Sequence, residues 1–198
     1  MRKLRDGQAA IDSMVMTVHQ RKTTALLEED IETSGTVFLK KPNLLRWEVE
    51  KPEKAVVVVD GEVMWQYRPK TNKAYKRLLS HDVKARDTMR FLASVMSLSI
   101  GDISKRFSTS VYRENEKTVL ALRPKSRIVA KYLKSVFIWY REHDGIPVRF
   151  IMEGRDGSTT TTEFTNIKVN TGIDDDTFRL ALPEGVWVIS SEDDDEFE

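Results

Sequence analysis

The pattern of apolar and polar positions in residues 37–67 predicts a run of antiparallel strands. The apolar runs are short, and proline or glycine follows each of them. Pro42 and Pro52 lack the backbone donor that an interior strand position needs, and Asp60-Gly61 supplies the positive φ angles of a tight hairpin turn. We therefore expect strands at residues 36–41 and 44–50, followed by a hairpin at residues 55–67.

The predicted strand at residues 44–50 has one apolar and one charged face. Successive side chains of a strand point to opposite faces, and here apolar and charged residues alternate strictly. The apolar set is Leu45, Trp47 and Val49. The sequence thus predicts a sheet with one apolar side, and the purpose of that side is the main question that the chain poses.

The remaining segments extend this meander and interrupt it with helices. Helical spacing predicts an N-terminal helix at residues 4–19, a second helix at 82–98 and a short one at 103–107. Residues 124–133 are ambiguous between a loop and a short helix. Further strands are predicted at residues 20–31, 73–79, 108–113, 118–122, 135–142, 147–153 and 159–169, with Asp144-Gly145 and Asp156-Gly157 as hairpin turns and a closing segment at 178–189.

These elements predict a mainly β fold with inserted helices: a curved antiparallel sheet or an incomplete barrel. A helix placed inside a β meander has to lie against a face of the sheet or across a mouth of the barrel. Such an arrangement can form a cavity. Both parities of residues 135–142 are apolar, which is typical of a strand covered on both faces.

Composition limits the function classes. The 198 residues suit one domain over residues 1–191, followed by an acidic, disordered tail at residues 192–198. A net charge of +1 gives no global field for non-specific nucleic-acid binding, and no apolar run reaches the length of a membrane span. The N-terminal residues lack the apolar core of a signal peptide, so an exported protein is expected here in its mature form. The absence of cysteine excludes disulfides, thiolate catalysis and a lipid-modified cysteine.

The sequence shows no apparatus for catalysis, metal binding or cofactor binding. His19, His81 and His143 have no zinc-site spacing, and residues 174–176 read as a solvated turn rather than a calcium loop. Phosphate-binding glycine loops and nucleophile elbows are also missing from the sequence. We expect a protein that is not an enzyme. By composition alone, an ordinary β-protein core accounts for the apolar residues.

Two stretches resemble the LolA family of periplasmic lipoprotein carriers. The first runs from Lys41-Pro42-Asn43 through Trp47, Asp60-Gly61 and Trp65-Gln66-Tyr67, and the second is Phe178 followed by Leu182-Pro183-Glu184-Gly185-Val186. The order of helices and strands between them also matches the family. The resemblance spans nearly the whole chain, with strong motifs at its two ends.

The resemblance implies an unclosed antiparallel β-barrel, or half-barrel, whose helical lid covers a hydrophobic cavity. Proteins of this family are periplasmic carriers that hold the acyl chains of lipoproteins. They collect this cargo from an inner-membrane ABC transporter and deliver it to an outer-membrane receptor. We accordingly expect acylated lipoproteins, that transporter and that receptor as partners, a periplasmic location, no nucleic acid, no cofactor and a monomer.

The resemblance and the strand parity together suggest acyl-binding residues. The expected cavity wall consists of Leu45, Trp47, Val49, Trp65 and Tyr67, and the expected lid residues are Met89, Leu92, Val95 and Met96. Which face of the sheet is concave cannot be derived from parity, and a role in the core remains an alternative for each residue.

Two positions depart from the family pattern. Lys41 stands where well-studied carriers have an arginine that is thought to latch the lid through backbone carbonyls. A lysine has a flexible point charge instead of a planar five-donor fork, so we expect a looser lid or a latch supplied elsewhere. Leu45 stands where an aromatic residue is frequent, which leaves the cargo contact at that position open.

Two other classes of function are weighed against the carrier. The same half-barrel could sense lipid or mislocalised lipoprotein, or bind another lipid or a glycolipid, although a sensor normally has a second domain. A lipid-modifying enzyme would show a nucleophile and base. The family's receptor is anchored by a lipidated cysteine, which this chain lacks.

Overall fold

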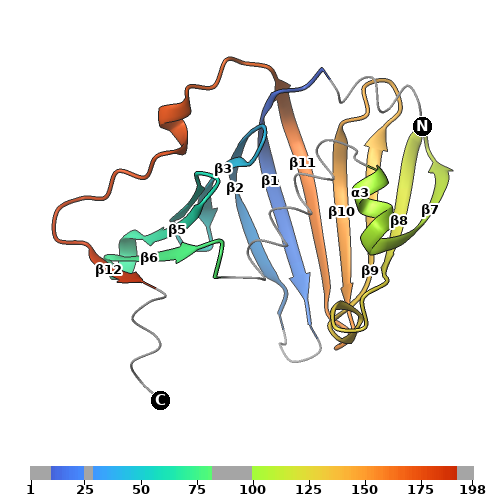
Figure 1. Cartoon of the computed structure of the whole chain (residues 1–198), viewed down its shortest axis with the longest axis horizontal. Helices are drawn as coiled ribbons and strands as arrows, with labels where there is room; N and C mark the ends of the chain where they lie inside the picture. The colour runs from blue at the N-terminus through green and yellow to red at the C-terminus, as the bar shows by residue number, and fades with distance from the viewer. Residues whose placement is uncertain (1–9, 25–28, 82–99, 191–198) are drawn as a thin grey trace. The chain divides into compact units, whose positions relative to one another are not determined.

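The structure is a computed structural model that describes residues 10–24, 29–81 and 100–190. Strands dominate it (Figure 1). They are β1 (Ser13–Thr23), β2 (Ile31–Lys40), β3 (Leu44–Lys51), β4 (Ala55–Val59), β5 (Val63–Arg68), β6 (Lys73–Leu78), β7 (Phe107–Glu114), β8 (Lys117–Pro124), β9 (Leu133–Arg141), β10 (Pro147–Gly154), β11 (Thr159–Val169) and β12 (Trp187–Ser190). Helical residues form α3 (Ile100–Arg106) and the short turns η1 (Pro69–Thr71), η2 (Val129–Lys131) and η3 (Asp175–Phe178).

All twelve described strands belong to one sheet, in the order β12-β6-β5-β4-β3-β2-β1-β11-β10-β9-β8-β7. Neighbours from β2 to β6 and from β7 to β11 pair antiparallel, whereas β12 pairs with β6 in parallel. The edge strands β12 and β7 have no bond to each other, so the sheet is open. The predicted fold class, mostly β with an antiparallel sheet that does not close, is confirmed at this level.

Backbone contacts divide the chain into two compact units. Unit 1 comprises Met1–Ile11, Val18–Thr33 and Ser94–Thr165, and unit 2 comprises Asp12–Thr17, Ser34–Ala93 and Asn166–Glu198. Strands β1, β2 and β11 each contribute residues to both units. The expectation of a single domain over residues 1–191 stays a prediction. Among the described residues, no helix combines the length and hydrophobicity needed to cross a membrane.

The core of unit 1 lies on one face of β8, β9 and β10. Leu120, Ile138 and Phe150 form a row across these strands and are buried, with Ile138 completely inaccessible. The other parity of β9, which contains Phe137 and Trp139, is only half-buried. The predicted burial of this strand therefore applies fully to one face and partly to the other.

The predicted N-terminal helix is wrong where the structure describes it. Residues 13–19 belong to strand β1, and residues 1–9 lie outside the described part of the chain. Met14, Met16 and Val18 are buried at 1%, 2% and 3% exposure, a period of two that the prediction overlooked in favour of spacings of three and four. Tertiary burial on the sheet outweighed a weak helical pattern.

Several other boundaries also changed. The predicted strand at residues 20–31 is divided between the end of β1 and the start of β2, and only the last residues of the closing segment form a strand, β12. The three Asp-Gly hairpins are confirmed, with Gly61, Gly145 and Gly157 at positive φ. A short helix occurs near the predicted residues 103–107, as α3. The predicted lid helix at residues 82–98 lies outside the described residues.

The pairing of β2 with β3 depends on a glycine. Gly35 is opposite Val49, and a Cβ atom added to it would lie 2.0 Å from the backbone oxygen of Glu48. Since that neighbour is backbone of the paired strand, a side chain can be accommodated only if the strands separate.

We therefore expect Gly35→Ala to reduce the free energy of unfolding by about 1–3 kcal/mol through overpacking. Urea unfolding followed by circular dichroism measures this. Ile31→Ala, at an exposed position of the same strand, serves as the control and should change stability by less than about 1 kcal/mol. Equal stability of the two variants would show that the strands separate at no cost.

Candidate functional site

An apolar face extends across strands β2 to β5 of unit 2. Directly paired residues of an antiparallel sheet share a face. One row across the strands is Leu39, Leu45, Val59 and Met64, and the next is Val37, Trp47 and Val57. We call these two rows, with Leu79, the apolar face.

The centre of the apolar face is buried and its margin is not. Leu45, Val59 and Leu79 have exposed fractions of 8%, 1% and 8% and form one cluster. The other members packed against this cluster, Leu39, Trp47, Val57 and Met64, are only partly buried. The partly buried residues around this buried cluster leave apolar surface that a ligand can cover.

Trp47 brings one polar atom into this face. Its indole Nε1 is buried but has no hydrogen-bond partner among the described residues. A buried donor without an acceptor costs about 1–3 kcal/mol. The indole is therefore an unsatisfied donor on this face, in the row that continues through Val57 to Gln66, and a ligand reaches it when the side chains that cover it move.

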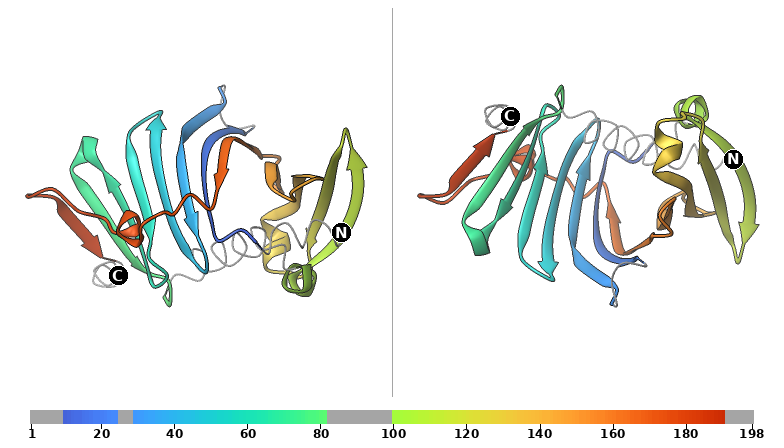
Figure 2. Two further views of the ribbon diagram at one scale, coloured as in Figure 1. Left: turned by 90° about the horizontal axis from the view of Figure 1, so that it is seen from above. Right: turned by 90° about the horizontal axis from the view of Figure 1, so that it is seen from below.

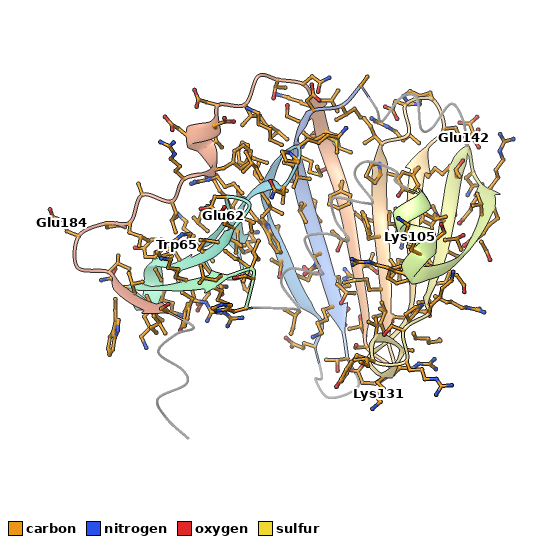
Figure 3. The ribbon with its side chains drawn as sticks, viewed as in Figure 1. Glu62, Trp65, Lys105, Lys131, Glu142 and Glu184 are labelled. Atoms are coloured by element: carbon orange, nitrogen blue, oxygen red, sulfur yellow. The ribbon has the colours of Figure 1, made fainter. Side chains whose placement is uncertain are left out.

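The opposite face of the same strands has a different character. Its central row is Phe38, Arg46, Val58, Trp65 and Lys76. The Lys76 ammonium lies 5.6 Å from the centre of the Trp65 ring, a cation–π contact. Trp65, labelled in Figure 3, is thus packed beneath a charge. We call this side the charged face.

The register separates the five predicted wall residues. Leu45, Trp47 and Val49 lie on the same side of the sheet, as strand parity indicated; Leu45 and Trp47 belong to the apolar face, and Val49 lies in the next row, between Gly35 and Ala55. Trp65 and Tyr67 are opposite Val58 and Val56, so they lie on the charged face. A single cavity wall can include only one of these sets. The predicted lid residues Met89, Leu92, Val95 and Met96 lie outside the described residues.

The sequence reasoning did not select the partners that complete the apolar face. Leu39, Val57, Val59 and Met64 join Leu45 and Trp47 there. Part of this arrangement could have been predicted from the turn at Asp60-Gly61. A tight hairpin there pairs odd-numbered residues of one strand with even-numbered residues of the other. Met64, and not Trp65, therefore lies beside Val59. The preference for aromatic residues obscured this.

The charged face of unit 2 is crossed by the segment between β11 and β12. Figure 2 shows this segment in front of the strands in one view and behind them in the other. The Lys40 ammonium donates to the carbonyl of Ile173 at 2.9 Å, and Arg46 Nη1 donates to that of Thr177 at 3.2 Å. Phe178 is 2% exposed. We call residues 170–186 the strap.

Comparison with known proteins identifies the family. The sequence model of the family described as outer membrane lipoprotein carrier protein LolA matches residues 10–181. The chain belongs to the LolA family. An outer-membrane lipoprotein carrier protein of Chromohalobacter salexigens is 28% identical over 158 residues, 80% of this chain and 71% of the relative. The protein of the same name from Xylella fastidiosa is 29% identical over 157 residues, 79% and 71% of the two chains.

A solved structure supports the fold independently. The crystal structure of an uncharacterized conserved protein from Thermus thermophilus is similar to this chain with a TM-score of 0.61. The alignment covers 96% of this chain and 95% of that chain, at 14% identity. At that identity the likeness concerns the fold alone.

The motifs that resemble the LolA family hold turns in place. Asn43 Nδ2 donates to the carbonyl of Gly61 at 3.3 Å, which joins the β2–β3 turn to the β4–β5 turn. Asn72 Nδ2 donates to the carbonyl of Gly185 at 2.9 Å, and the Trp187 amide donates to the carbonyl of Asn72 at 3.0 Å. The C-terminal motif therefore places β12 beside β6.

Lys41, the predicted latch of this LolA-family chain, is joined to the N-terminal segment through its backbone. Its amide donates to the carbonyl of Asp12 at 2.8 Å. Lys40 and Arg46 make the kind of cation-to-carbonyl contact predicted for Lys41, but with the strap instead of the lid. Because the predicted lid lies outside the described residues, the latch role of Lys41 stays a prediction. Within residues 10–24, 29–81 and 100–190, no group of acidic or histidine side chains could hold a metal ion.

We expect Arg46→Met to loosen the strap while the sheet stays folded. The change removes the donor to Thr177 and leaves that carbonyl without its cation, a loss of about 1.5–3 kcal/mol for a charged hydrogen bond. Amide hydrogen exchange should accelerate by about tenfold or more at residues 174–180.

Arg113→Met is the matched control, since it removes an ion pair with Glu142 at an exposed site of unit 1. It should leave exchange in the strap unchanged. Equal protection of the strap in both variants would mean that Phe178, and not Arg46, holds it.

Proposed function

We propose that the chain is a periplasmic carrier that shelters the acyl chains of lipoproteins on the apolar face. The observation that carries the proposal is this face in a LolA-family chain: two apolar rows across β2 to β4, one of which continues to Met64 in β5, a partly buried rim and one donor without an acceptor. Support comes from the relatives, which are named outer-membrane lipoprotein carrier proteins. The cargo would come from an inner-membrane ABC transporter and go to an outer-membrane receptor.

Physical chemistry explains why such a carrier is needed. Burial of each CH₂ group in the bilayer is favourable by roughly 0.8 kcal/mol of transfer free energy. One sixteen-carbon chain therefore anchors a lipoprotein in the bilayer by on the order of 12 kcal/mol. Spontaneous passage through water is therefore extremely slow. A carrier has to offer comparable apolar shelter and still release its cargo, which favours aliphatic and methionine side chains and a movable cover.

The predicted helix at residues 82–98 is our candidate for that cover. The acyl chains would lie between the apolar face and this helix, which would contact them through Met89, Leu92, Val95 and Met96. Charged-face residues Trp65 and Tyr67 have no part in the site under this proposal, because the strap crosses their side of the sheet.

Neighbouring valines of β4 allow a test of the face. Val57 belongs to the apolar face and Val56 to the charged face, and both are partly buried. We expect Val57→Thr to raise the Kd for a fluorescent sixteen-carbon fatty acid about fivefold, since a hydroxyl in the wall costs roughly 1 kcal/mol to desolvate. Fluorescence titration gives the Kd.

Val56→Thr is the matched control, with the same chemical change one residue away. It should bind the fatty acid like the unaltered protein, and thermal unfolding checks that both variants fold. If Val56→Thr weakens binding as much as Val57→Thr, or only Val56→Thr weakens it, the apolar face is not the acyl site.

The Trp47 indole should recognise the ester carbonyl at the head of an acyl chain. We expect Trp47→Phe to weaken binding of a diacyl ester about fivefold, the worth of one hydrogen bond of roughly 1 kcal/mol. Binding of the corresponding dialkyl ether, which lacks the carbonyl, should change much less. Equal losses for ester and ether would assign Trp47 a packing role only.

Transport itself needs a cellular test. The full chain, added to spheroplasts of its host, should release acylated lipoproteins into the medium, and native mass spectrometry of protein from the host's periplasm should find an acylated ligand. Release should fall for Val57→Thr and not for Val56→Thr. Copurification of a glycolipid or free lipid without any lipoprotein release would replace the carrier with a lipid-binding function.

A further inference from the structure

The connection between β8 and β9, with the strand residues next to it, is strongly basic. Residues 123–134, which we call the basic tip, contain five Lys or Arg and no Asp or Glu, although the whole chain has a net charge of only +1. The cations are Arg123, Lys125, Arg127, Lys131 and Lys134. Figure 3 shows Lys131 beyond the ends of the strands of unit 1.

The basic tip also displays apolar side chains to solvent. Tyr132 and Ile128 have exposed fractions of 74% and 73%, the highest of any large hydrophobic residue that the structure describes. Val129, between them, is 39% exposed. Soluble surfaces expose single hydrophobic residues routinely, but here three lie within five positions and between cations.

Hydrogen bonds hold this exposed conformation in place. The short helix η2 closes through the Ala130 amide, which donates to the carbonyl of Ser126 at 2.9 Å. Arg155, from the β10–β11 turn, donates through its amide to the Tyr132 carbonyl at 2.9 Å and through Nε to the Ala130 carbonyl at 3.2 Å. The backbone of the tip is therefore tied to unit 1, and the side chains of Ile128 and Tyr132 project from an ordered base.

The central cations of the tip are not neutralised. Within the described residues, neither Arg127 nor Lys131 has a carboxylate partner. Lys125 donates to the Ser104 carbonyl at 2.7 Å and Lys134 lies 3.2 Å from Glu153, so these two are partly engaged. The Ser135 hydroxyl, followed by the Lys134 ammonium, lowers the pKa of Glu153 below its usual value. The contacts of that carboxylate are with Ser135 and Lys134 and not with Arg127 or Lys131.

We infer that the basic tip docks unit 1 on an anionic phospholipid surface. Ile128, Val129 and Tyr132 enter the boundary between headgroups and acyl chains, where tyrosine is favoured, and Arg127 and Lys131 lie at the phosphates. Each Lys or Arg near an anionic membrane contributes about fivefold to binding. An exposed tip with apolar side chains between cations suits a deformable interface better than a rigid protein pocket.

This inference does not depend on the identity of the cargo. A carrier of membrane-anchored molecules gains from a weak, reversible contact with the bilayer, and a short tip with few apolar groups provides such a contact. Failure of membrane docking leaves the acyl-binding proposal intact, and failure of acyl binding leaves membrane docking intact. The two are measured separately.

Vesicle flotation of the full chain tests the inference. The protein should float with vesicles of phosphatidylethanolamine and phosphatidylglycerol, float poorly with phosphatidylcholine alone, and detach at high ionic strength. Arg127→Gln with Lys131→Gln should weaken binding to the anionic vesicles roughly thirtyfold. Ile128→Ser with Tyr132→Ser should weaken it about tenfold or more through the lost apolar burial.

Matched controls distinguish the tip from general charge and hydrophobicity. Lys51→Gln with Lys54→Gln removes two exposed cations of unit 2, and Val111→Ser with Tyr112→Ser removes two exposed apolar side chains of β7, which are 46% and 44% exposed. Neither control should change flotation, and fatty-acid titration checks that all variants still bind.

Absence of flotation, equal flotation with both vesicle types, or equal losses in tip and control variants would overturn the inference. If the tip variants lose lipoprotein release from spheroplasts although the unaltered protein never floats, the tip is a docking site for a protein and not for a membrane.

Discussion

The register of β2 to β5 decides what each side of unit 2 can do. Adjacent side chains of a strand point to opposite faces, so a shift of one position would exchange the whole set. Leu39, Leu45, Val59 and Met64 form one row because the β2–β3, β3–β4 and β4–β5 turns have the lengths they have. The contact between Asn43 and Gly61 joins those two turns, and the close approach at Gly35 fixes the strands between them.

That register separates two kinds of surface that the sequence places side by side. Arg46 is adjacent to both Leu45 and Trp47 in the chain, yet its guanidinium faces the strap while they face the other way. The strap satisfies the cations of the charged face with its carbonyls and covers part of that face with Phe178. Because one side is occupied by the chain's own C-terminal segment, the apolar side is the one at which a second molecule can be accommodated without displacing it.

Prediction from sequence succeeded where turn chemistry is local and failed where the answer depends on distant strands. Pro42, Pro52 and the Asp-Gly pairs located most strands, and parity alone grouped Leu45 with Trp47. The N-terminal segment was read as a helix because the burial of Met14 and Met16 depends on sheet neighbours that are far away in the sequence. Trp65 was grouped with Trp47 by parity and by the family resemblance, but the pairing of β4 with β5 places the two on opposite faces; the role of Trp65 in the site stays a prediction. The charge run at residues 123–134 was visible in sequence, but its meaning required the exposure of Ile128 and Tyr132.

The family motifs and the apolar face have different physical roles in this chain. Asn43, Gly61, Asn72 and Gly185 act through backbone carbonyls and turn conformations, which few other residues can replace. Apart from Trp47, the apolar face between those turns consists of leucine, valine and methionine, which exchange with one another at small cost in a packed surface. The motifs therefore preserve the turns, and the side chains of the apolar face, apart from Trp47, have no such role in turn formation.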